Sequence, residues 1–124
     1  MHTFILLLAS NWQAASNMAK AIDCLRLQFP TESTFSLIHE SEAQGVATPL
    51  ASTYLNAVCA GKTLLSLEEM ERWLKETENA LGRMRGEAAK GRVAIDLDLV
   101  EWDDRILRPV DAGRSYYLTC LKDL

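Results

Sequence analysis

The first part of the chain divides into a short apolar element and a longer amphipathic one. Phe4 to Ala9 is an unbroken apolar run, stopped by Ser10-Asn11, and its length predicts a strand buried on both faces. From Ala14 to Phe29, apolar side chains recur every three or four residues, which predicts an amphipathic helix. Pro30 ends this helix, because proline lacks the backbone N–H that a further turn would need.

The middle of the chain favours extended structure. Ser33 to Glu40 contains several β-favouring residues and predicts a second strand. Ser41 to Ala51 is rich in Gly, Thr, Pro and Ala, and predicts a loop that is long for a simple connection. Thr53 to Thr63 predicts a third strand.

The second helix carries clear signals at both ends. Ser66 and Glu69 have the spacing of a capping box, in which each side chain binds the backbone N–H of the other residue. Gly82 is a suitable stop, because glycine accepts the left-handed conformation that often follows a helix. The polar segment from Arg83 to Arg92 predicts a mobile loop.

The strongest alternation of apolar and polar residues lies between Ala94 and Trp102, and it predicts a strand with one buried face. Asp103-Asp104 then predicts a turn that returns the chain through Arg105 to Leu107. The tail from Arg114 to Leu124 is compatible with either a short helix or a strand. The resulting order, β-α-β-β-α-β, predicts an α+β ferredoxin-like sandwich, an antiparallel sheet with two helices on one face.

Composition narrows the range of functions. The chain has 124 residues, enough for one domain, and its net charge of -4 argues against broad nucleic-acid binding. Cys24, Cys59 and Cys120 are widely spaced and predict reduced, mostly buried thiols in a cytoplasmic protein. The apolar run at the N-terminus is too short to span a membrane and lacks the basic segment of a signal peptide.

Two carboxylates are the first candidates for chemistry. Asp96 and Asp98 alternate with apolar residues, so they lie on one face of the predicted strand, about 6–7 Å apart along the chain. Such a pair can bind Mg²⁺, which prefers oxygen ligands and keeps water and phosphate in its shell. The alternative is an ordinary half-exposed strand with an acidic outer face.

Positive charge gathers next to these carboxylates. Between Arg83 and Arg92 there are four basic residues and one acid, Glu87, although the whole chain is acidic. Basic side chains beside paired carboxylates favour a ligand made of a metal ion and a polyphosphate. The alternative is a solvated basic loop.

Five short motifs, in order along the chain, resemble those of the 6-hydroxymethyl-7,8-dihydropterin pyrophosphokinases. They are Leu8-Ala9-Ser10-Asn11, Tyr54-Leu55-Asn56-Ala57-Val58, Glu78-x-x-x-Gly82-Arg83-x-Arg85, Ile95-Asp96-Leu97-Asp98-Leu99 and Arg114-Ser115-Tyr116-Tyr117-Leu118. The resemblance runs from about Phe4 to Leu121. It implies one pterin pyrophosphokinase-like domain over residues 1–124 that lacks the family's C-terminal elements.

The resemblance also implies an activity and the residues that perform it. The family transfers the β,γ-diphosphate of ATP to a hydroxymethyl pterin in folate biosynthesis. Asp96 and Asp98 would bind Mg²⁺, and Arg83 and Arg92 would be catalytic. The implied ligand-binding residues are Tyr54, Asn56 and Tyr116 for the pterin, and Glu78, Arg85 and Arg114 for the nucleotide. The implied partners are ATP and a pterin, without nucleic acid or membrane, and the protein would be a monomer or a homodimer.

Several departures from the family pattern keep other functions open. Ala9 replaces a glycine of the first turn, Arg92 lies one position early relative to the aspartate strand, and Lys90 is nearest to an expected tryptophan. Arg108-Pro109-Val110 lacks the family's ATP-contacting histidine. The leading hypothesis is a Mg-ATP-dependent transferase. The alternatives are a non-catalytic homologue that binds a pterin or nucleotide, and an unrelated ferredoxin-like interaction domain.

Overall fold

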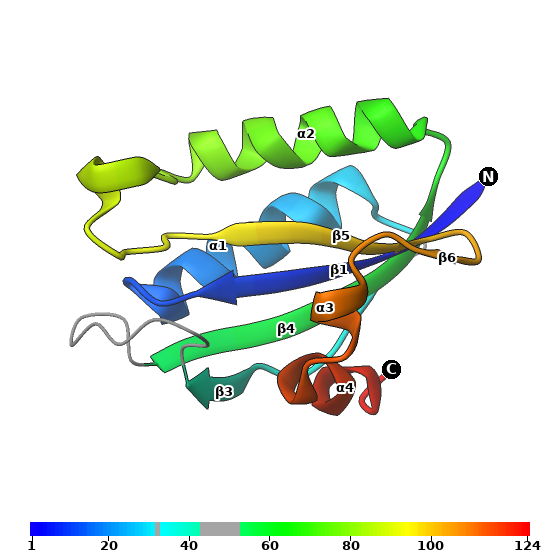
Figure 1. The fold of residues 1–124 in the computed structure, drawn as a ribbon. Helices are drawn as coiled ribbons and strands as arrows, with labels where there is room; N and C mark the ends of the chain where they lie inside the picture. Colours follow the sequence, from blue (N-terminus) through cyan, green and yellow to red (C-terminus); the bar gives the residue numbers. More distant parts are fainter. Residues whose placement is uncertain (32, 43–52) are drawn as a thin grey trace.

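The computed structural model describes residues 1–31, 33–42 and 53–124, and it combines one sheet with several helices (Figure 1). The strands are β1 (His2–Ser10), β2 (Thr34–Phe35), β3 (His39–Glu42), β4 (Thr53–Thr63), β5 (Asp96–Trp102) and β6 (Arg105–Ile106). The helices are α1 (Ala14–Gln28), α2 (Leu67–Ala80), α3 (Pro109–Ala112) and α4 (Ser115–Leu121), with a 3-10 turn, η1, at Gly86–Ala89. Most of the predicted loop from Ser41 to Ala51 lies outside the described residues.

The sheet is antiparallel, as predicted, and β1 is its central strand. β1 pairs with β4 on one side and with β5 on the other. The full order is β2-β4-β1-β5-β6, with β3 pairing with β4 beside β2. β6 covers only the far end of β5, at Glu101 and Trp102, so no other strand pairs with the outer edge of β5 at its aspartate end in the described part of the chain.

The two faces of β1 enter different hydrophobic cores, which explains its unbroken apolar sequence. Leu6 and Leu8 pack with α1 and α2, whereas Leu7 packs with α4 on the opposite face. All three leucines are buried. The prediction that this strand is buried on both faces is therefore confirmed, and the sheet can present a site only where a covering helix stops.

The C-terminal tail, whose structure the sequence left open, forms a helix. Tyr117 and Cys120 of α4 pack on Val58 and Val100 of the sheet, on the face opposite to α1 and α2. Figure 1 shows α3 and α4 lying together across β4, away from α2. Two helices do pack on one face of the sheet, as expected, but a further helix, α4, packs on the other face.

The predicted second strand is divided into β2 and β3. Ser36 lies between them: its N–H donates to the Val58 carbonyl and its hydroxyl accepts from the Val58 N–H. The Ser36 hydroxyl also donates to the Leu37 carbonyl. A side chain therefore takes the place of a backbone partner at this point, and the regular strand pairing is interrupted.

The predicted ends of α2 are present, and the segment that follows contains a short helical turn. The capping box of Ser66 and Glu69 is present, and Gly82 follows the helix with a φ of 96°. Both helix-end predictions are confirmed. The segment from Arg83 to Arg92, expected to be a mobile loop, contains the turn η1, and Gly86 enters it with a φ of 68°. Across residues 1–31, 33–42 and 53–124, no helix has the length and apolarity needed to cross a membrane.

Candidate functional site

Strand register places the paired carboxylates on the face of the sheet that α4 partly covers. Ala9 pairs with Asn56 on one side and with Asp96 on the other. Leu7 pairs in the same way with Val58 and Asp98. Directly paired residues of neighbouring strands point to the same face, and residues two apart along a strand do so as well. Asp96, Asp98 and Asn56 therefore face the same side as Leu7, which packs against α4.

A cavity of about 210 Å³, here called the sheet cavity, opens above this face. It brings together residues that are distant in the sequence. The predicted site residues that line it are Tyr54, Asn56, Asp96, Asp98, Arg114 and Tyr116. Its other lining residues include Ala9, Ser41, Arg108 and Asp111.

A second cavity, the helix cavity, lies between α2 and β5 and has a volume of about 490 Å³. It contains the remaining predicted residues of α2 and the following segment, namely Glu78, Arg83 and Arg85. Asp96, Asp98 and Arg108 line both cavities. These three residues, here called the shared wall, border both the sheet cavity and the helix cavity. A group bound at the carboxylate pair can therefore be reached from either cavity.

The two carboxyl groups of the pair are partly shielded from water, and each disfavours a negative charge on the other. Burial, and after it the neighbouring Asp96, raises the pKa of Asp98 to about 8. Each carboxylate has an arginine partner: Asp96 Oδ1 lies 3.4 Å from Arg83 Nη1, and Asp98 Oδ1 lies 3.8 Å from Arg108 Nη2. The arginines offset only part of the cost of burying negative charge here, so the site favours an additional cation.

Glu78 and Arg83 bind two backbone groups at the open edge of the sheet beside β5. Glu78 Oε2 accepts a hydrogen bond of 2.7 Å from the Leu97 N–H, and Arg83 Nη1 donates one of 3.0 Å to the Ile95 carbonyl. Glu78 Oε1 accepts from Arg85 Nη2 at 2.8 Å. Glu78 is buried, and burial is the main reason why its pKa is raised. These contacts hold the aspartate end of β5 against the end of α2.

The donors and acceptors present fit a hydrated cation that is shared with an anionic ligand. Within the described ranges, no group of three or more His, Cys, Asp or Glu side chains could hold a metal ion. Two carboxylates suffice for Mg²⁺ when water and phosphate supply its other ligands. Arg83 Nε is a buried donor without a hydrogen-bond partner in the described part of the chain, which fits an anion beside the cation.

The polar and aromatic residues of the sheet cavity are held by their neighbours. Asn56 is almost fully buried, and its Nδ2 donates to Ser41 Oγ and to the His39 carbonyl. Burial is the main cause that raises the pKa of both Tyr54 and Tyr116, so both phenols stay protonated at neutral pH. Tyr117, the next residue, points instead into the core, where its hydroxyl donates to Glu101.

Arg92 lies outside both cavities. Its guanidinium stacks 5.2 Å from the centre of the Trp12 ring, and its Nε donates to the Ala89 carbonyl. Asn11 fixes this region from the other side by binding the Val93 N–H and the Gly91 carbonyl. The catalytic role predicted for Arg92 therefore requires its side chain to leave Trp12.

Arg108, Asp111 and Ser41 line the site but were not singled out from the sequence. Arg108 Nε donates to the Asp111 carboxylate, a contact three residues apart at the start of α3. Pro109 at the first position of that helix and an acid two residues later are the signals that mark this turn. No periodic pattern marks Ser41.

The carboxylate pair at the edge of an antiparallel sheet, with an arginine beside each carboxylate and two adjoining cavities, has the charges that suit a protein handling phosphate groups. The sequence matches the model of the 7,8-dihydro-6-hydroxymethylpterin-pyrophosphokinase (HPPK) family over residues 5–124. The chain therefore belongs to the HPPK family, as its motifs predicted.

Membership places the chain among pyrophosphokinases of folate biosynthesis that act on a pterin. It also removes the alternative of an unrelated interaction domain, because the match spans nearly the whole chain. No curated protein matches the sequence.

Proposed function

We propose that the protein transfers the β,γ-diphosphate of Mg-ATP to the hydroxymethyl group of 6-hydroxymethyl-7,8-dihydropterin, releasing AMP. The observation that carries this proposal is the shared wall: Asp96 and Asp98 face both the sheet cavity and the helix cavity. A diphosphate that is transferred between ligands in the two cavities would lie beside these carboxylates. The family match supports the same reaction class.

In this proposal the sheet cavity holds the pterin. Tyr116 and Tyr54 offer aromatic faces for a flat ring, and the Asn56 amide offers hydrogen bonds to the ring edge. Arg114 lines the same cavity and would contact the phosphate nearest to the pterin. The size of the cavity, about 210 Å³, suits a small bicyclic ligand.

The helix cavity would hold the nucleotide, with Arg83 and Arg85 beside its phosphates. Arg83 has a buried donor to offer, whereas Arg85 is already paired with Glu78. Glu78 would act mainly by positioning Arg85 and β5. Mg²⁺, held by Asp96 and Asp98, would supply neutralisation of the phosphate charge and alignment of the two ligands.

We also infer that the arrangement is the ferredoxin-like βαββαβ sandwich. Its support is the strand order: β5 and β4 flank β1, and the short strands β2 and β3 lie beyond β4. The helices α1 and α2 both pack on one face of the sheet, the face opposite to α4. The cytoplasmic location and the monomeric or dimeric state remain predictions.

A product assay tests the activity. Incubation with Mg-ATP and 6-hydroxymethyl-7,8-dihydropterin is expected to release AMP, and Asp96→Asn is expected to lower kcat at least about a hundredfold, because phosphoryl transfer depends on charge neutralisation. Asp104→Asn, in the exposed turn before β6, removes the same charge away from the site and serves as the matched control. Wild-type activity in Asp96→Asn would contradict the proposal.

The position of Arg92 favours a second candidate, a homologue that binds these ligands without catalysis. Thermal stabilisation by the pterin or by Mg-ATP without any AMP would support it, because a ligand that binds only the folded state raises its stability.

A further inference from the structure

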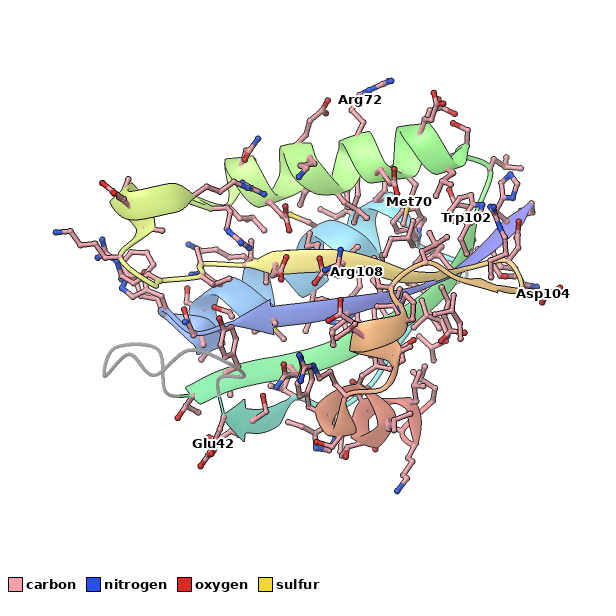
Figure 2. The ribbon with its side chains drawn as sticks, viewed as in Figure 1. Glu42, Met70, Arg72, Trp102, Asp104 and Arg108 are labelled. Atoms are coloured by element: carbon pink, nitrogen blue, oxygen red, sulfur yellow. The ribbon has the colours of Figure 1, made fainter. Side chains whose placement is uncertain are left out.

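Arg108 lies where the two cavities meet, although no motif assigned it a role. It lines both the sheet cavity and the helix cavity. Figure 2 shows its side chain extending from the segment before α3 toward β5. Its Nη2 lies 3.8 Å from Asp98 Oδ1, and its Nε donates to Asp111. Arg108 therefore contacts one carboxylate of the pair, and Arg83 contacts the other.

The two arginines beside the pair differ in how firmly they are held. The Arg83 side chain is 19% exposed and is tied to the Ile95 carbonyl of the strand edge. The Arg108 side chain is 49% exposed, and within residues 1–31, 33–42 and 53–124 it is held by two carboxylate side chains, Asp98 and Asp111. Long, exposed side chains change rotamers at low cost, so Arg108 is the arginine that can exchange partners.

The lining of the two cavities carries charged side chains of both signs. Arg108 contacts two of the acids, Asp98 and Asp111. A divalent cation at Asp96 and Asp98 would compete with Arg108 for Asp98. A polyphosphate that arrives with the cation gives Arg108 a new anionic partner, which a guanidinium can bind with two parallel hydrogen bonds.

We propose that Arg108 is an exchangeable partner of Asp98, which pairs with this carboxyl group in the free protein and moves to the phosphate groups when the Mg-nucleotide binds. This inference rests on the proposed function. It makes Arg108 a positioning residue that couples the two ligands: the protein binds Mg²⁺ weakly alone and more tightly together with a polyphosphate.

Two binding measurements on Arg108→Gln test this exchange. Calorimetric titration with Mg²⁺ alone is expected to show binding about two- to five-fold tighter than in the wild type, because a half-exposed competitor has been removed. Titration with Mg²⁺ and α,β-methylene-ATP, which is not cleaved at the α,β position, is expected to show roughly tenfold weaker nucleotide binding. A residue with a purely structural role would weaken both.

Matched variants separate the effect of this position from that of net charge. Arg72→Gln removes the same charge from the outer side of α2, where Figure 2 shows Arg72 pointing away from the sheet, and it is expected to change neither affinity. Arg108→Lys is expected to keep the weak binding of Mg²⁺ alone. Thermal unfolding of each variant verifies that it is folded.

The outcomes also distinguish this inference from the proposed function. Opposite changes of the two affinities in Arg108→Gln support the exchange. If the wild type binds both ligands and Arg108→Gln leaves both affinities unchanged, or weakens both, the exchange is overturned while the proposed function stands. If the wild type binds neither Mg²⁺ nor the Mg-nucleotide, both fail.

Discussion

At the scale of single residues, the carboxyl group of Asp98 lies in surroundings that disfavour its charge. Burial and Asp96 raise its pKa from 3.8 to about 8. The folded protein therefore holds this proton more tightly than the unfolded chain does. The resulting stabilisation is complete below about pH 4 and is lost as the pH rises through the range up to 8.

Asp98→Asn is accordingly expected to stabilise the metal-free protein, by about 0.5–2 kcal/mol near pH 8 and by little near pH 4. The asparagine keeps the shape of the side chain but carries no charge at any pH. Thermal unfolding in a chelating buffer between pH 4 and pH 8 measures the difference. A variant less stable than the wild type at pH 8 would contradict this account of the site.

Ala9 is a second residue whose effect is local. It pairs with Asn56 and with Asp96 and lines the sheet cavity, at a position where the family has glycine. Ala9→Gly removes one methyl group from this cavity. It is expected to lower the KM for the pterin and to cost about 0.5–1 kcal/mol of stability, because glycine is more flexible when unfolded. Steady-state kinetics and chemical unfolding test the two effects, and an unchanged KM would show that the methyl group does not crowd the ligand.

At the scale of elements, the end of α2 and the edge of β5 depend on each other through Glu78. Glu78→Ala leaves the Leu97 N–H without its acceptor and leaves Arg85 with Asn79 alone, and it is expected to destabilise the protein by about 1–3 kcal/mol. Hydrogen exchange of the Leu97 amide is expected to become faster. Glu78→Gln keeps one acceptor oxygen and is the matched control. Unchanged exchange at Leu97 in Glu78→Ala would contradict this role.

The elements also show which features can be predicted from a sequence. Alternation places Asp96 and Asp98 on one face, and the capping box locates α2, because both depend on local geometry. The interruption at Ser36 and the position of Arg108 depend on contacts between distant segments. Periodicity does not record such contacts. The sequence therefore predicted the two carboxylates that line both cavities, Asp96 and Asp98, but it did not predict Arg108.

At the scale of the whole molecule, α4 contributes side chains both to one hydrophobic core and to the lining of the sheet cavity. Tyr117 is buried against Leu7 and Val58, while its neighbour Tyr116 lines the sheet cavity. Tyr117→Ala is expected to cost about 3–5 kcal/mol, the usual range for an aromatic residue removed from a core. Tyr117→Phe loses only the hydrogen bond to Glu101, about 1 kcal/mol.

Chemical unfolding measures both changes, and Tyr116→Phe provides the comparison. It removes a hydroxyl from the cavity lining and is expected to leave stability within about 0.5 kcal/mol. If Tyr117→Ala were as stable as the wild type, α4 would not be part of the folded core.

The contacts of Glu78 and Arg83 with β5 have a further consequence, for encounters between molecules. A strand whose outer N–H and C=O groups are unpaired can recruit a strand from another chain and begin aggregation. Here the Leu97 N–H and the Ile95 carbonyl are already bound by side chains. Glu78 and Arg83, which line the helix cavity, thus also leave fewer backbone groups at this edge for a strand of another copy to pair with.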